Sequence, residues 1–249
     1  MGSELNNSKK AWSVLIVSTL AFTVCFMVWM MFGVIGIPIK KALNLNSTQF
    51  GLLTAVPVLT GSLIRVPLGI WTDRYGGRIV MTILMALTVP AIWMMGYATE
   101  YWHFLTIGLF VGLAGGSFSV GTPYVARWFP PRRQGMAMGV YGAGNSGAAV
   151  NKFIAPVLLV GFGWTMVPQV YAAIMLGTVI LFWMFSYSDP KHLVPSNVKF
   201  MDQLKALKDP KVIKYCQYYS IVFGGYVAMA LWMVQYYVGE FGLDIRVAA

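Results

Sequence analysis

Hydrophobic residues dominate this chain in long runs that are separated by short polar or turn-forming stretches. One helical crossing of a bilayer takes about 20 predominantly apolar residues. Seven runs approach or exceed that length, and we predict spans at residues 11–37, 50–71, 79–98, 102–126, 134–160, 165–187 and 214–238. The pattern therefore predicts an all-α membrane protein.

The composition supports this prediction and excludes several other classes. Of the 249 residues, 58% are hydrophobic and 10% are charged, whereas soluble domains carry about 25% charged residues. A disordered chain would need low hydrophobicity. The 18 lysines and arginines are too diluted to form the basic stripe of a nucleic-acid-binding protein. The first run is also longer than the ~7–15 apolar residues of a signal-peptide core.

The distribution of cations predicts the orientation. If the N-terminus is cytoplasmic, 13 of the 18 lysines and arginines fall on the cytoplasmic side. Only Lys40, Lys41 and Arg246 fall on the other side, and Arg65 and Lys152 lie within spans. Because cytoplasmic loops carry an excess of lysine and arginine, we expect a multi-pass membrane protein with a cytoplasmic N-terminus.

Arg65 is a charge within a predicted span, and no predicted span contains an acid at bilayer depth. A charged residue there costs at least about 2.5–3.5 kcal/mol, which makes it a functional candidate by default. A guanidinium presents a planar fork of donors that suits planar oxyanions. The alternative is an arginine satisfied by backbone carbonyls or water.

Lys152 follows Asn145 by seven residues, so both side chains point to nearly the same helix face. Two interpretations remain open for this lysine. It snorkels toward the outer interface, or it takes part in substrate binding or proton coupling.

The segment Gly142-Ala143-Gly144-Asn145-Ser146-Gly147 matches G-x-G-x-x-G, but the strand and βαβ unit of a dinucleotide site are absent. We predict instead that glycines allow close helix packing, at Gly139, Gly142, Gly144 and Gly147. Asn145 then offers a neutral amide donor at membrane depth, although packing alone would also account for the segment. We expect no cofactor, no metal site and no enzymatic activity.

The loop after the second span resembles a known signature. It reads Asp73-Arg74-Tyr75-Gly76-Gly77-Arg78, which is similar to the D-R-x-G-G-R motif of the major facilitator superfamily. Further segments resemble the nitrate/nitrite porter family within it: Leu53-Thr54-Ala55-Val56-Pro57, Leu63-Ile64-Arg65-Val66-Pro67, Gly115-Gly116-Ser117-Phe118 and Gly144-Asn145-Ser146-Gly147.

This resemblance implies a secondary active transporter that moves nitrate and nitrite across the inner (plasma) membrane by alternating access. Arg65 would grip the anion and Asn145 would hydrogen-bond to it. Phe118, Tyr219 and Phe223 would flank it. The implied cytoplasmic gate motif consists of Asp73, Arg74, Gly76, Gly77 and Arg78. At Lys152, by contrast, the family has a neutral residue, so no role is inherited there.

The resemblance also implies a domain organisation with two six-helix halves. Residues 1–187 would form the N-terminal half, 188–213 the cytoplasmic loop between the halves, and 214–249 the first helix of the C-terminal half, which makes a C-terminal truncation expected. Expected partners are nitrate, nitrite, the lipid bilayer and, as a candidate co-substrate, protons. The protein would be a monomer that binds no nucleic acid.

Two alternatives remain. The same fold could carry another small anion such as oxalate or formate. A seven-helix receptor or sensor would also fit the number of spans, but the predicted cytoplasmic N-terminus and a seventh span without an interior lysine argue against it.

Overall fold

The computed structural model describes residues 2–188 and 208–249, with the backbone alone for residues 2–7. All regular structure in these ranges is helical: α1 (Gly2–Trp29), α2 (Phe32–Ala42), α3 (Ser47–Leu63), α4 (Arg65–Tyr75), α5 (Gly77–Met95), α6 (Tyr101–Val111), η1 (Gly112–Gly116), α7 (Ser117–Ala126), α8 (Pro131–Gly142), η2 (Ala143–Ser146), α9 (Gly147–Phe162), α10 (Met166–Phe185), α12 (Pro210–Phe241) and α13 (Ile245–Ala248). Most of the loop predicted over residues 188–213 lies outside the described residues.

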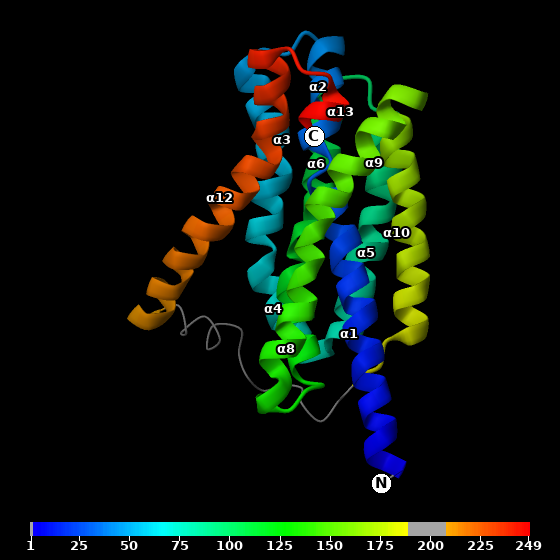
Figure 1. Cartoon of the computed structure of the whole chain (residues 1–249), viewed down its shortest axis with the longest axis vertical. Helices are drawn as coiled ribbons and strands as arrows, with labels where there is room; N and C mark the ends of the chain where they lie inside the picture. Colours follow the sequence, from blue (N-terminus) through cyan, green and yellow to red (C-terminus); the bar gives the residue numbers. More distant parts are fainter. Residues whose placement is uncertain (1, 189–207) are drawn as a thin grey trace.

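The helices combine into seven segments that are long and apolar enough to cross a membrane. They run over Ser8–Ala42, Ser47–Tyr75, Gly77–Met95, Tyr101–Ala126, Pro131–Phe162, Met166–Phe185 and Pro210–Phe241. The all-α membrane fold predicted from the hydrophobic pattern is confirmed. Figure 1 shows the segments side by side, with the N-terminus at one end of the bundle and the C-terminus at the other.

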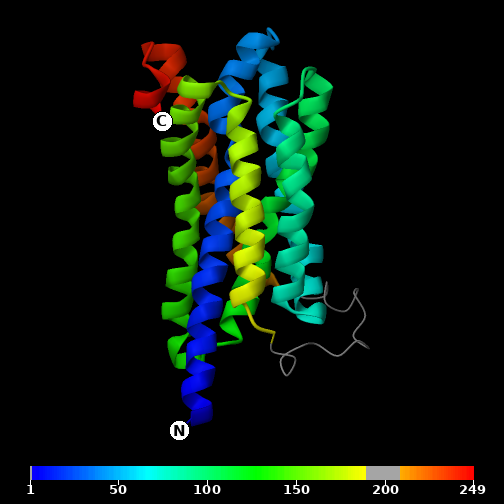
Figure 2. The ribbon, with the colours of Figure 1, turned by 90° about the vertical axis from the view of Figure 1, so that its right-hand side faces the viewer.

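The first segment forms the centre of the bundle. Its most apolar window is 78% buried, more than that of any other segment in the described chain. Helix α1 packs against α7, α8, α9 and α10, and α2 continues it against α3, α9 and α12. Helix α10 lies on the face opposite α12 (Figure 2).

Four of the seven segments are interrupted near the middle of the bundle. The first breaks at Met30 and Met31, and the second at Ile64. The fourth and fifth segments tighten into the 3₁₀ turns η1 and η2. Irregular backbone at membrane depth is tolerated only where it is buried in protein or lines a cavity, so these breaks mark the level at which a site is expected.

The break after α1 is held by a buried pair of side chains. Asn151 of α9 donates from Nδ2 to the carbonyl oxygen of Met30 at 3.0 Å, and its Oδ1 accepts from the Tyr171 hydroxyl at 2.8 Å. Asn151 is 2% exposed and Tyr171 is fully buried. The pair thus satisfies polar groups that have no access to water.

Helix α12 contacts the rest of the bundle unevenly. It begins at Pro210, inside the range predicted for the loop, with Asp209 as its N-cap. Farther along, it packs against α2, where a Cβ added at Gly33 would lie 3.4 Å from the carbonyl oxygen of Ala230. Toward its N-terminal end α12 leans away from α4 (Figure 1).

Removing the buried pair provides a test of the break. We expect Asn151→Ala and Tyr171→Phe each to lower the melting temperature of the purified protein by about 3–6 °C, because each leaves one buried polar group without a partner. The double variant should be less destabilised than the sum of the single variants. Additive effects would show that the two side chains act independently.

Candidate functional site

Arg65 lies at the break between the second segment's two helices, as the first residue of α4. Its Nε donates to the carbonyl oxygen of Gly115 in η1 at 3.3 Å. Its guanidinium carbon lies 5.0 Å from the ring centre of Phe223 and 5.7 Å from that of Trp29. No ion pair among the described residues involves Arg65. Aromatic faces and a carbonyl therefore stabilise its charge without a carboxylate.

The predicted aromatic residues gather around this arginine. Tyr219 and Phe223, one turn apart on α12, stack at 5.1 Å with ring planes 14° apart. Phe118 of α7 stacks on Tyr219 at 6.2 Å. Four of the residues expected at the site, Arg65 among them, therefore lie together although three different segments supply them.

A cavity of about 1030 Å³ lies between the second segment and α12. Arg65, Tyr219 and Phe223 line it. Thr54 and Ser62 contribute hydroxyl groups to a wall that is otherwise largely aliphatic and aromatic. Arg65 is the one charged residue of this lining within the described chain. The cavity thus offers one fixed positive charge in apolar surroundings, where a charge interacts more strongly than in water.

Trp29 is a site residue that the sequence reasoning missed. It is 1% exposed, and its Nε1 donates to the carbonyl oxygen of Pro57 at 2.9 Å. A Cβ added at Gly61 or Gly115 would lie 2.7 or 2.5 Å from the indole, so only glycine fits there. The indole thereby fixes how closely three segments approach each other beside Arg65. The sequence shows both glycines, but it does not show that Trp29 is the residue that packs against them.

Asn145 lies in η2 and faces α12. Its Nδ2 donates to the carbonyl oxygen of Gly142 at 2.9 Å, while its backbone carbonyl accepts from the hydroxyl of Tyr226 at 3.0 Å. Its Oδ1 is buried and has no hydrogen-bond partner among the described residues. Asn145 is not part of the cavity lining. Because an amide nitrogen carries two protons, one donor of Nδ2 remains for a ligand.

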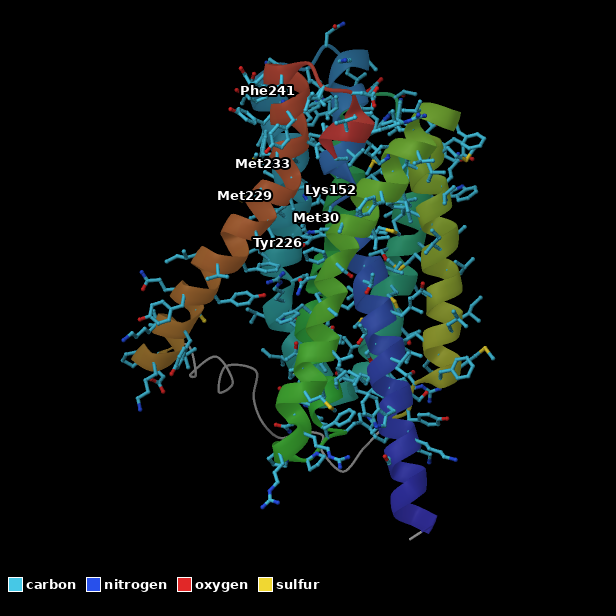
Figure 3. The ribbon with its side chains drawn as sticks, viewed as in Figure 1. Met30, Lys152, Tyr226, Met229, Met233 and Phe241 are labelled. Carbon is cyan, nitrogen blue, oxygen red and sulfur yellow. The ribbon has the colours of Figure 1, made fainter. Side chains whose placement is uncertain are left out.

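Lys152 is half-buried on α9, beyond Asn145 in the direction of the C-terminal end of the bundle. It makes no hydrogen bond or ion pair with a described residue. Figure 3 shows it at the level of Met30 and Met229. It is not part of the lining of the cavity around Arg65.

The predicted gate motif connects the ends of several helices. Gly76 ends α4 with φ 85°, a backbone conformation that favours glycine. Asp73 forms an ion pair with Arg127, the C-cap residue of α7. Arg78 donates from Nη2 to the carbonyl oxygen of Trp183 at 2.7 Å, near the end of α10. The Arg74 guanidinium lies 5.9 Å from the ring centre of Tyr75.

Close packing also involves Gly77 of this motif, since a Cβ there would overlap Tyr124 of α7. The motif thus stabilises contacts among α4, α5, α7 and α10 at the end of the bundle that carries the N-terminus.

Comparison with known proteins assigns this architecture to a family. The Major Facilitator Superfamily pattern matches residues 17–249, almost the whole chain. The chain belongs to the Major Facilitator Superfamily. It is therefore a multi-pass membrane protein, and the D-R-x-G-G-R resemblance is confirmed at the level of the superfamily.

Curated relatives confirm the narrower resemblance. The probable nitrate/nitrite antiporter NarK1 of Thermus thermophilus is 41% identical over 95% of this chain and 56% of its own length. The nitrite extrusion protein of Bacillus subtilis is 30% identical over 91% of this chain and 57% of its own. The chain thus spans just over half the length of these relatives.

Solved structures show the same superfamily fold. A bacterial homolog of the human lysosomal transporter Spinster, inward-facing and unoccupied, aligns with a TM-score of 0.73 and 19% identity over 96% of this chain and 58% of that one. A D-xylose-proton symporter aligns with a TM-score of 0.67 and 15% identity over 95% of this chain and 64% of that one.

The four predicted packing glycines of this superfamily member differ in their surroundings. A Cβ at Gly144 would overlap Phe22, and one at Gly147 would overlap the carbonyl oxygen of Thr23, both on α1. At Gly139 and Gly142, no described atom lies within 4 Å of an added Cβ. The predicted close packing therefore has a partner among the described residues at Gly144 and Gly147 only.

This difference predicts that the same substitution destabilises one position and not the other. Gly147→Ala should lower the melting temperature by about 3–10 °C, because overpacking against a backbone carbonyl costs about 1–3 kcal/mol. Gly139→Ala, at an exposed position inside α8 of the same segment, is the matched control and should not lower it, since alanine is favoured over glycine within a helix. An equal loss at Gly139 would mean that this open face packs against something beyond the described residues.

Proposed function

We propose that the chain is the N-terminal part of a secondary transporter that moves nitrate and nitrite across the cytoplasmic membrane by alternating access. The observation that carries this proposal is the single fixed positive charge, Arg65, in an aromatic cavity between membrane-spanning segments. A cavity with that charge and no carboxylate in its described lining selects for a mobile anion. The relatives named as nitrate and nitrite transporters narrow the anion.

The geometry of Arg65 suits a planar oxyanion. The hydrogen bond to Gly115 is made by Nε, and the guanidinium also interacts with the Tyr219 hydroxyl. Donation in parallel to two oxygens of one anion would use the terminal nitrogens. The flat rings of Tyr219 and Phe223 provide the adjacent walls. Asn145 lies in η2, next to α12. The second Nδ2 proton of its side chain would donate a neutral hydrogen bond to the anion when η2 and α12 close around it.

The distribution of charge supports a cytoplasmic N-terminus. Thirteen of the 18 lysines and arginines then lie on the cytoplasmic side, as the positive-inside rule requires. The end that carries the gate motif is then the cytoplasmic end, and the end with α13 is the outer one.

The gate motif would act at the cytoplasmic end. Asp73 and Arg78 already contact the ends of α7 and α10. We expect these contacts, together with Arg74, to be rearranged when the cytoplasmic side opens or closes. We also expect a single polypeptide to be the functional unit, and protons are a candidate co-substrate.

Substitution of Arg65 tests the proposed substrate site. In the full-length protein reconstituted into vesicles, Arg65→Lys keeps the charge but loses the planar fork. Nitrate and nitrite uptake should therefore fall by about 100-fold, the equivalent of about 3 kcal/mol of charge-assisted hydrogen bonding. Arg133→Lys, at the exposed start of α8, is the matched control and should retain uptake.

Near-normal uptake by the Arg65→Lys variant would remove Arg65 from the substrate site. Competition with formate and oxalate separates the anion classes. Inhibition of nitrate uptake by nitrite but not by the two carboxylates is the expected result, and stronger inhibition by oxalate would overturn the choice of nitrate.

A further inference from the structure

A second cation at membrane depth, Lys152, lies outside the site around Arg65. It has no ion-pair or hydrogen-bond partner among the described residues, although it is half-buried. The neighbouring Asn151 pairs with Met30 and Tyr171 and makes no hydrogen bond with Lys152. A half-buried ammonium that has no carboxylate partner is stabilised when a mobile anion binds to it.

The hydrogen bond between Tyr226 and Asn145 shows where Lys152 lies, about two helical turns farther along α9. The Tyr226 hydroxyl donates to the backbone carbonyl of Asn145, which joins α12 to η2. Both segments run toward the same end of the bundle (Figure 1). Moving seven residues along each, about 10 Å at 1.5 Å per residue, leads from this contact to Lys152 and Met233.

The figures agree with this placement. Figure 3 shows Lys152 level with Met30 and Met229 and between the levels of Tyr226 and Met233, on the side of α9 toward α12. Lys152 is thus on the Asn145 side of α9, which is the side toward α12.

Figure 3 shows Met30 and Met229 at the level of Lys152 and Met233 slightly beyond it. Met30 is 2% exposed, and its thioether is apolar but polarisable. Apolar surroundings at membrane depth solvate a strongly hydrated anion poorly, but they tolerate a small anion whose charge is spread over several oxygens. The ammonium supplies the charge and the hydrogen bond that hold this anion.

The Lys152 side chain is too short to snorkel to the outer membrane interface. Helix α9 continues to Phe162, ten residues or about 15 Å beyond Lys152, which exceeds the length of a lysine side chain. In addition, α13 packs near the outer ends of α9 and α2, where Ala248 is buried in a cluster with Ile37 and Val234.

We propose that Lys152 is an outer binding station for the transported oxyanion, which the anion occupies before it reaches Asn145 and Arg65. This inference rests on the proposed function and deepens it. Besides Arg65, Lys152 on α9 would be the second cationic contact for the anion. It lies about two helical turns closer to the outer end than Asn145.

Sided transport measurements test the station. In full-length protein reconstituted into vesicles, we compare Lys152→Gln with wild type, presenting nitrate either to the outer or to the cytoplasmic face. Lys152→Gln should raise the outer KM by about tenfold, as expected for one lost charge-assisted hydrogen bond. The cytoplasmic KM and the maximal rate should change by less than about twofold.

Two further variants serve as controls. Lys152→Arg should restore the outer KM to within about threefold of wild type, since it keeps the charge. Lys41→Gln, which removes an exposed charge at the outer end of α2, should change neither KM. Lys152→Met removes the charge and the hydrogen-bond donor together. A variant that folds poorly would show a lower melting temperature and a lower maximal rate in both directions.

Equal KM changes for Lys152→Gln and Lys41→Gln, or equal changes on both faces, would overturn the station. These outcomes are distinct from failure of the proposed function. If wild-type protein carries no nitrate, the proposed function fails, and normal transport by Arg65→Lys removes Arg65 from the substrate site. An unaffected Lys152→Gln beside an inactive Arg65→Lys removes only the outer station.

Discussion

The contact between the Trp29 indole and the glycines of two neighbouring segments sets the geometry on which the candidate site depends. Since Gly61 and Gly115 leave no room for a Cβ beside this ring, the second and fourth segments approach the first as closely as their backbones allow. This approach brings the Gly115 carbonyl to Arg65. The indole donates its own proton to Pro57, so the large buried ring leaves its polar atom satisfied.

The same region solves a second physical problem, which is how to keep an arginine charged within a membrane protein. Aromatic faces lie on its guanidinium, and a carbonyl from a 3₁₀ turn accepts its Nε proton. No ion pair in the described chain neutralises it. Neutralisation is therefore left to a ligand. Segment breaks, aromatic residues and charge all meet at one depth of the bundle, because backbone irregularity and buried charge both require protein rather than lipid around them.

The sequence predicted the spans and Arg65 because long apolar runs and an isolated charge within one of them are local properties. It could not identify Trp29, since nothing local distinguishes this aromatic residue from others in the same apolar run. The pairing of Asn151 with Tyr171 was equally hidden, because it joins residues of two segments. Of the glycines, Gly147 and Gly139 look alike in sequence, and only the position of α1 decides which of them is packed.

The flat ring stacks of α12 have a mechanical consequence. Tyr219 and Phe223 present nearly parallel faces to Phe118 and Trp29, and parallel faces can slide without stranding a polar group. Asn145, in contrast, is flanked by glycines that are interlocked with α1. At this face, α12 can therefore slide on its aromatic rings, while η2 is held in place by its packing against α1. The hydrogen bond from Tyr226 to Asn145 and the interaction of the Tyr219 hydroxyl with Arg65 must both break for α12 to move along this face.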